Sequence, residues 1–135
     1  MGGYIAKLVV KKIISANKIL NGASILLMGL TFKENVSDIR NSKVVDLVKE
    51  LASYGLKVDV VDPNADKAEV KREFEIDLLD APEGKYDCVI VAVNHKEYCD
   101  LEENYFQSIL EQPGVFIDIK GIYRDKIKDL IYWSL

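Results

Sequence analysis

The length, composition and charge of the chain exclude several classes of protein. Its 135 residues are enough for one domain with a sizeable core and too few for two. With 49% hydrophobic and 30% charged residues, the chain has the composition of a soluble globular domain and not of a disordered one. The formal net charge is −4 and the acids are spread along the chain, which argues against a nucleic-acid-binding protein with a basic face.

The sequence carries no sign of a membrane span or a signal peptide. No apolar run approaches the roughly 20 residues that cross a bilayer. Lysines at positions 7, 11 and 12 interrupt the apolar N-terminal stretch, and a small-residue cleavage site is missing. We therefore expect a cytoplasmic protein that binds neither a membrane nor nucleic acid.

The two cysteines, Cys88 and Cys99, lack the spacing of a metal site or a disulfide framework. Cys88 lies in the apolar run 88–93, which favours a buried, inert thiol. Cys99 lies in a polar loop four residues after His95, so a Cys–His nucleophile is the alternative reading there, although no activating base is evident.

The chain opens with an expected helix and a buried strand. Apolar residues at three- and four-residue spacings over 5–20 predict an amphipathic helix that stops at Asn21-Gly22. Because this helix starts at residue 1 without a cap, we expect the chain to have continued upstream. The continuous apolar run 24–30 is typical of a strand buried on both faces of a parallel sheet.

A polar, aperiodic segment, 31–41, precedes the second helix. The pattern over 42–55 predicts that helix, with Asn41 or Ser42 as its N-cap, and 57–63 reads as a strand closed by an Asp-Pro turn. A short helix is expected over 65–72.

The second half continues the alternation. The segment 74–87 is ambiguous, with a short strand or turn followed by a loop; 88–93 is the clearest buried strand; 102–110 is a short helix and 115–120 a further strand. The C-terminal tail is expected to pack on the body through three residues: Ile131, Tyr132 and Trp133. Strands alternating with helices predict an α/β fold, a Rossmann-like, doubly wound parallel sheet in a three-layer α/β/α arrangement.

Ligands of such sheets bind outside the carboxyl ends of the strands. The segments 31–41, 94–98 and 120–124 reach that edge. The first of them leads into a helix N-terminus, where unpaired N–H groups attract anions. Lys33 and Arg40 add positive charge there and Phe32 offers a ring for stacking, which together predict a phosphate-bearing nucleotide. The alternative is a solvated loop in which Asp38 and Arg40 only order one another.

A dinucleotide fingerprint is missing from this loop. Such a site needs G-x-G-x-x-G between the first strand and its helix, and the chain offers only Gly29 there. Asp62 ends the second strand, where these folds place a ribose-binding acid, but the proline after it favours a turn former.

The run MGLTFKENVSDIRNSKVVDLV closely resembles the C-terminal domain of the UDP-glucose/GDP-mannose dehydrogenase family, whose signature is a strand ending G-x-T/S-F-K, a loop, D-x-R and a helix. Matches at 61–63, 92–98 and 117–121 extend the resemblance over nearly the whole chain. The pattern looks most like bacterial enzymes that oxidise UDP-N-acetylhexosamines to uronic acids for capsule or O-antigen polysaccharides.

The resemblance implies a role for each matching residue. Phe32, Lys33, Glu34 and Asn35 would line the nucleotide-sugar site, and Lys120 would also contact the substrate, although many relatives carry arginine there. Arg40 would reach NAD held by the other domain. The residues given structural roles are Gly29, Asp38 and Asp62, and no catalytic role is carried onto His95.

The resemblance also implies how the chain is organised. Residues 1–20 would be the end of a long central linker helix that builds a homodimer, and 21–135 the UDP-sugar-binding domain. The nucleophilic cysteine and the glycine-rich NAD loop of the family lie upstream, so we expect an enzyme fragment that is inactive alone and works with an N-terminal NAD-binding domain. The alternative is a stand-alone nucleotide-sugar-binding module with a regulatory or scaffolding role.

Overall fold

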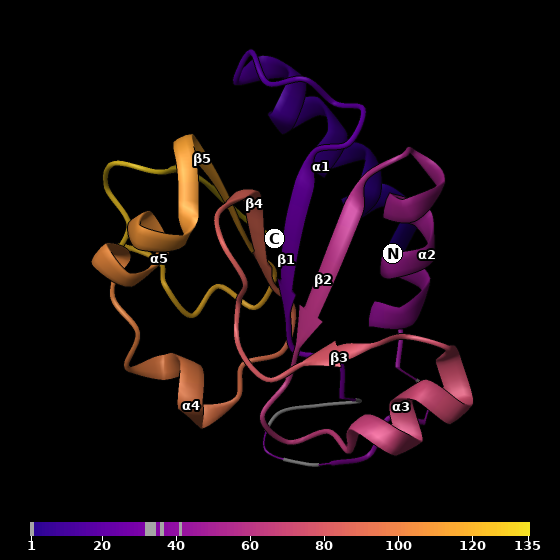
Figure 1. Cartoon of the computed structure of the whole chain (residues 1–135). Helices are drawn as coiled ribbons and strands as arrows, with labels where there is room; N and C mark the ends of the chain where they lie inside the picture. The colour runs from indigo at the N-terminus through magenta and orange to yellow at the C-terminus, as the bar shows by residue number, and fades with distance from the viewer. Residues whose placement is uncertain (1, 32–34, 36, 41) are drawn as a thin grey trace.

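The computed structural model describes residues 2–31, 35, 37–40 and 42–135, and in this part of the chain helices and strands alternate around one sheet (Figure 1). The elements are α1 (Gly2–Ser15), β1 (Ser24–Met28), α2 (Val44–Ser53), β2 (Lys57–Val61), α3 (Lys67–Phe74), β3 (Leu78–Leu79), β4 (Tyr86–Val91), α4 (Lys96–Cys99), α5 (Glu103–Ile109), β5 (Leu110–Asp118) and β6 (Ile131–Ser134). None of the helices seen here is long and apolar enough to cross a membrane.

The sheet has six strands in the order β3-β2-β1-β4-β5-β6, and every pair is parallel. The order reverses direction between β1 and β4, which makes that junction the topological switch point of a doubly wound fold. The predicted Rossmann-like α/β architecture is confirmed. The carboxyl ends of β1, β4 and β5 lie together, since Ala92 N donates to Met28 O at 2.9 Å and Ile119 N donates to Val91 O at 3.1 Å.

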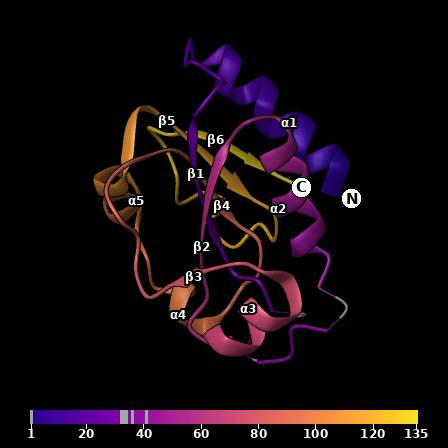
Figure 2. The same cartoon turned by 45° about the vertical axis from the view of Figure 1, so that its right-hand side comes forward.

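Two apolar cores cover the two faces of the sheet, because successive strand side chains point to opposite sides. Ile25 and Leu27 face the core that includes α1 and α2, whereas Leu26 and Met28 face the one that includes α5. Figure 2 shows α1 and α2 on the side of the sheet opposite α5. Three layers result, as the alternation of elements predicted.

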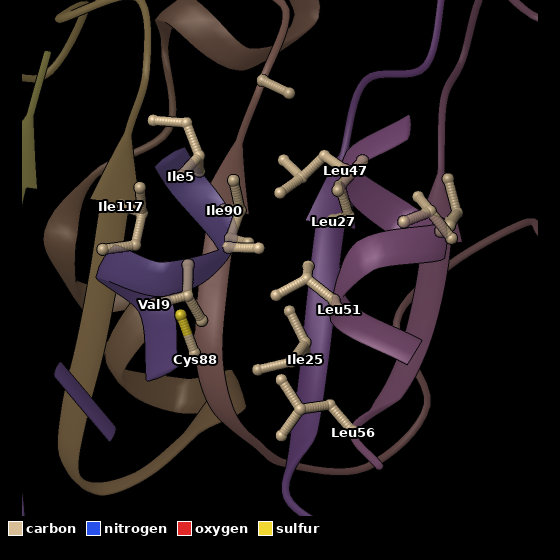
Figure 3. Close-up of a cluster of buried hydrophobic side chains, with 14 of the residues drawn as sticks. Ile5, Val9, Ile25, Leu27, Leu47, Leu51, Leu56, Cys88, Ile90 and Ile117 are labelled. Carbon is tan, nitrogen blue, oxygen red and sulfur yellow. The ribbon is translucent and has the colours of Figure 1, made fainter. Parts of the chain in front are cut away.

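Helix α1 belongs to the core of this domain. Ile5 and Val9 are fully buried, and Figure 3 shows them beside Cys88, Ile90 and Ile117 of the sheet. Leu47 and Leu51 of α2 lie over β1 in the same figure. The apolar stripe of the first helix therefore has a partner within the chain, which the sequence did not reveal.

The first helix is shorter than its periodicity predicted. It ends at Ser15 and not at Asn21-Gly22, because Asn17 adopts a left-handed φ of 60°. Lys18 N donates to Ile13 O at 3.2 Å and Asn17 N donates to Ile14 O at 3.0 Å, the paired bonds of a helix C-terminal cap. Leu20 still packs on the core, so its apolar character is explained without a helix.

The start of α2 also differs from the expectation. Its N-cap is Lys43, without a side-chain capping bond, and the Ser42 hydroxyl donates to Leu30 O at 2.6 Å. Ser42 therefore closes a loop instead of capping a helix; Asn41, the other expected cap, lies outside the described residues.

The remaining differences concern short elements. The ambiguous segment contains the two-residue strand β3, and the loop after β4 contains the short helix α4. The C-terminal tail forms β6, in which Tyr132 pairs with Phe116 and Trp133 with Ile117. A strand of four residues at the edge of the sheet has too little pattern to be recognised from the sequence alone.

Candidate functional site

The loop between β1 and α2 is fastened at both ends to the body of the domain. Leu30 at its start and Ile39 near its end are buried in the core. The bond from the Ser42 hydroxyl to Leu30 O joins the two ends across the base of the loop. Phe32, Lys33 and Glu34, expected to contact the substrate, lie outside the described residues.

Gly29 allows β1 and β4 to approach at the entrance to this loop. Its φ is +100°, and a Cβ at this position would lie 2.7 Å from the Val93 Cβ and 2.9 Å from the Val93 N. A side chain fits neither the space nor the backbone angle. The glycine thus serves the approach of two strands at the switch point.

Asp62 is buried after β2 and holds the start of the loop. Its Oδ2 accepts N–H bonds from Leu30 at 2.6 Å and Thr31 at 3.0 Å, and its Oδ1 accepts one from Asn64 at 2.7 Å. The bond to Asn64 N, two residues ahead, is the turn-forming contact that the Asp-Pro sequence favoured. Both oxygens are thus engaged inside the protein, which fits a turn-forming and loop-holding role for Asp62.

The electrostatic balance at Asp62 favours its ionised form. Burial raises the pKa of the carboxyl, but the hydrogen bonds from His95 and from the N–H groups of Leu30, Asn64 and Thr31 together hold it below its usual value. At neutral pH the buried carboxylate is therefore an ionised acceptor for the backbone around it.

His95, which follows β4, joins the same cluster and was missed as a site residue. Its ring is fully buried, with Nε2 3.0 Å from Asp62 Oδ2 and 3.1 Å from Thr31 Oγ1, and Nδ1 accepts from Asn35 N at 2.9 Å. The Asn35 side chain in turn accepts from Lys96 N at 2.8 Å. Asn35, which was expected to contact the substrate, is thus hydrogen-bonded to the loop after β4. The only sequence signal for this contact was the position of His95 in the polar segment that follows a buried strand.

Arg40 and Asp38 form an exposed ion pair. Arg40 N and Nε donate to Asp38 Oδ1 at 2.8 and 3.1 Å, and Nη2 donates to Oδ2 at 3.2 Å. These bonds to Arg40 hold the pKa of Asp38 below its usual value. The Arg40 side chain remains 85% exposed, so the pair orders the arginine and still presents its guanidinium at the surface.

A second buried aspartate, Asp118, organises the segment after β5. Its Oδ1 accepts from Gly121 N at 2.9 Å and Ile122 N at 3.2 Å, and its Oδ2 accepts from Tyr123 N at 2.8 Å and the Tyr132 hydroxyl at 2.5 Å. Burial and the bond to Asp118 raise the pKa of Tyr132 to about 12, so this hydroxyl stays a donor. Lys120 lies exposed in the turn that Asp118 supports.

These contacts define two clusters at one edge of the sheet. The first joins the loop after β1 to Asp62 and His95 by direct hydrogen bonds, and the second is the turn around Asp118 that carries Lys120. A family model described as the UDP-glucose/GDP-mannose dehydrogenase family, UDP binding domain, matches residues 26–125, which include both clusters. The chain belongs to this family.

Relatives of the UDP-binding domain agree with this assignment. Protein CapL of Staphylococcus aureus is 43% identical over 123 residues, which are 90% of this chain and 29% of CapL. UDP-N-acetyl-D-glucosamine 6-dehydrogenase of Pseudomonas aeruginosa is 38% identical over 131 residues, which are 96% of this chain and 31% of that enzyme. The chain therefore spans less than a third of the length of these relatives.

Solved structures show that this fold is shared by the family. The UDP-D-ManNAc dehydrogenase of Pyrococcus horikoshii matches 98% of this chain and 30% of its own with a TM-score of 0.82 at 20% identity. The NDP-N-acetyl-D-galactosaminuronic acid dehydrogenase of Methanosarcina mazei Go1 matches 98% of this chain and 28% of its own with a TM-score of 0.86 at 19% identity.

The two cysteines of this UDP-binding domain do not form a nucleophilic site with His95. Cys88 is fully buried, and burial raises the pKa of its thiol. The Cys99 thiol lies 3.6 Å from the backbone oxygen of His95, while the ring nitrogens bond to other groups. Within the described ranges, no group of histidine, cysteine and acidic side chains is arranged to hold a metal ion.

Proposed function

We propose that the chain supplies the nucleotide-sugar-binding part of an NAD-dependent UDP-sugar 6-dehydrogenase. The observation that carries this proposal is the junction of the loop 31–41 with Asp62 and His95 at the switch point of the sheet, within the region that matches the UDP-binding domain of the family. Ligands of doubly wound sheets bind at this position. Relatives named as UDP-N-acetyl-D-glucosamine and UDP-N-acetyl-D-mannosamine dehydrogenases support a UDP-N-acetylhexosamine as the substrate.

In this proposal Phe32, Lys33, Glu34 and Asn35 contact the nucleotide sugar, together with Lys120. The two lysines supply the positive charge that a diphosphate requires. The hollow between this loop and α3 is lined by Asp38, Glu69 and Glu73 and by one cation, Arg40, so its net negative charge would repel a phosphate. This charge distribution argues against a phosphate on the α3 side of the loop.

We propose that this chain does not hold NAD by itself. Gly29 packs against Val93, and the glycine-rich loop that would cradle a pyrophosphate is missing from the sequence between β1 and α2. We therefore propose that another domain of the same polypeptide binds NAD and that Arg40, exposed at the surface, reaches toward it. The role of the chain alone is then binding and not turnover.

We further propose that the full protein is a cytoplasmic homodimer that makes UDP-uronic acids for capsular or O-antigen polysaccharides. The dimer would form through α1 and the segment after it, where the apolar side chains of Tyr4, Ile14 and Ile19 are 60%, 55% and 82% exposed. The relative CapL supports a role in polysaccharide synthesis.

A titration of the isotope-labelled chain with UDP tests the binding proposal. Chemical-shift changes are expected over residues 29–42 and 118–124, with weak affinity because half of the pocket wall would come from the other domain. A charge-assisted contact is worth about 1.5–3 kcal/mol, so Lys33→Ala should weaken UDP binding roughly tenfold to a hundredfold.

Lys49→Ala is the matched control, because Lys49 is an exposed lysine on α2. It should bind UDP like the unmodified chain. Shift changes in other segments, together with unaltered binding by Lys33→Ala, would show that the ligand lies elsewhere. In the full-length enzyme, Arg40→Ala should act on NAD binding or turnover and leave UDP binding unchanged.

A further inference from the structure

His95 connects three segments that are distant in the sequence. It is the single histidine of the chain and follows β4 at the carboxyl edge of the sheet. Its fully buried ring contacts Asp62 after β2 and both Thr31 and Asn35 in the loop after β1.

The partners of the ring determine which nitrogen carries the proton. The backbone N–H of Asn35 can only donate, so Nδ1, at 2.9 Å, must offer it a lone pair. In a neutral imidazole the single N–H is then on Nε2. Nε2 lies 3.0 Å from Asp62 Oδ2, an ionised carboxylate that can only accept, so the two contacts require the same tautomer.

Asn35 is held from two directions. Its own N–H donates to the ring of His95, and its side-chain oxygen accepts from Lys96 N at 2.8 Å. These bonds hold it in a left-handed conformation with φ of 60°, which asparagine tolerates better than most residues. Four residues earlier, Thr31 is bound to Asp62 through its N–H and contacts His95 through its hydroxyl.

The residues between these two anchors are Phe32, Lys33 and Glu34, on which the proposed nucleotide-sugar contacts depend. Thr31 and Asn35, on either side of them, contact the same imidazole: Asn35 N donates to Nδ1, and Thr31 Oγ1 lies 3.1 Å from Nε2 as a second acceptor beside Asp62. Reversing the tautomer would present an N–H to the N–H of Asn35 and a lone pair to the carboxylate of Asp62. Only the Nε2–H tautomer therefore satisfies both Asn35 and Asp62.

We propose that His95, as the Nε2–H tautomer, is the positioning residue of the nucleotide-sugar loop and fixes the proposed substrate residue Asn35 at the edge of the sheet. Its Nδ1 holds Asn35, and its Nε2 is oriented by Asp62. The inference rests on the proposed function for the ligand, but its effect on the loop can be measured without any ligand.

Two conservative variants test the roles of the two ring nitrogens separately. The side-chain oxygen of asparagine reaches about as far as Nδ1 of histidine, and the terminal amide of glutamine about as far as Nε2. His95→Asn should therefore retain the acceptor for Asn35 N–H and lose the donor to Asp62, whereas His95→Gln should retain that donor and lose the acceptor for Asn35.

The expected result is a crossover between two measurements. His95→Gln should speed amide hydrogen exchange at Asn35 and weaken UDP binding about tenfold, the size expected for one lost hydrogen bond at the site. His95→Asn should unfold at lower urea concentration and retain more of the UDP affinity. A residue with only a packing role would change affinity and stability in parallel, so parallel changes in both variants would overturn the proposal.

The ring nitrogen spectrum of the unmodified chain gives a second, independent reading, because its single histidine produces one set of signals. A proton on Nε2 and a lone pair on Nδ1 are expected for the neutral ring. A proton on Nδ1, or unaltered Asn35 exchange in His95→Gln, would refute the positioning role. If the unmodified chain does not bind UDP although the tautomer and the exchange behave as expected, the proposed function fails and His95 positions the loop for some other ligand.

Discussion

Two buried aspartates, Asp62 and Asp118, hold the backbone at the carboxyl edge of the sheet. Each accepts three backbone N–H bonds, and each also bonds to one ring-bearing side chain, His95 or Tyr132. An ionised carboxylate suits this task because it has only acceptor sites. A single buried carboxylate thus holds the backbone at the start of each loop that carries proposed binding residues.

Asp62→Asn should destabilise the fold although it preserves the shape of the side chain. One oxygen becomes an NH2 donor surrounded by donors, so at least one buried N–H loses its acceptor. We expect the free energy of unfolding to fall by about 2–4 kcal/mol, measured by urea denaturation. Asp38→Asn is the control, because Asp38 forms a surface ion pair and its loss should lower the free energy of unfolding much less. Equal effects in the two variants would contradict the structural role of Asp62.

The lowered pKa of Asp62 makes this contribution dependent on pH. Because its pKa in the folded state lies below the unfolded value of about 3.9, the carboxylate stabilises the fold fully above that value. The contribution is lost as the pH falls through the folded-state pKa. Unfolding curves between pH 6 and pH 2 should therefore show a smaller acid-induced loss of stability in Asp62→Asn than in the unmodified chain, and parallel curves would contradict the assigned direction.

At the scale of elements, the fold depends on a few places where backbone segments meet. Gly29, directly after β1, lies against Val93, the second residue after β4. The helix α1 ends where Asn17 adopts a left-handed conformation. Both positions lie outside the regular hydrogen-bonding patterns of helix and strand. Gly29 and Asn17 determine how neighbouring elements are connected, and the candidate site lies at the junction of β1 and β4.

Gly29→Ala tests the approach of β1 and β4. The new methyl group would lie 2.7 Å from Val93 Cβ, and the φ of +100° would be strained as well. Gly84→Ala is the matched control, since its φ is +82° and a Cβ there meets nothing within 4 Å. We expect Gly84→Ala to lower the free energy of unfolding by about 1 kcal/mol and Gly29→Ala by roughly 3 kcal/mol or more. Equal losses in urea denaturation would show that no steric contact limits Gly29.

At the scale of the whole molecule, α1 presents two different faces. One is buried in the core of the domain through Ile5, Val9 and Ile13. The other is exposed and combines Tyr4 and Ile14 with Lys7 and Lys11. The helix is therefore integral to this domain, and only its outer face remains for a second copy of the chain.

We expect the chain to self-associate through this outer face, and sedimentation at several concentrations measures it. Tyr4→Glu should shift the equilibrium toward the monomer, because it places a charge among apolar side chains at the interface. The same change at Tyr54, which is 38% exposed after α2, should leave self-association unaltered. A monomer at every concentration, with strong amide protection over residues 4–18, would contradict this prediction.

The sequence by itself determined the α/β class and most of the elements, because a strand buried on both faces or an amphipathic helix leaves a local record in the spacing of apolar residues. The Asp-Pro turn at Asp62 was recognised for a local reason as well, whereas the structural role of Gly29 was implied only by the family resemblance. The resemblance of the loop 31–41 to one family likewise depends on consecutive residues.

Only the tertiary structure decided which distant groups meet. Asp62 and His95 lie 33 positions apart, and Asn35 and His95 lie 60 apart, so no local pattern marks their bonds. The strand β6 has four residues and becomes a strand through its pairing with β5, and α1 finds its partner in the sheet of its own domain. Local periodicity indicates that a side chain is buried. The partner against which it packs is determined only when the whole chain folds.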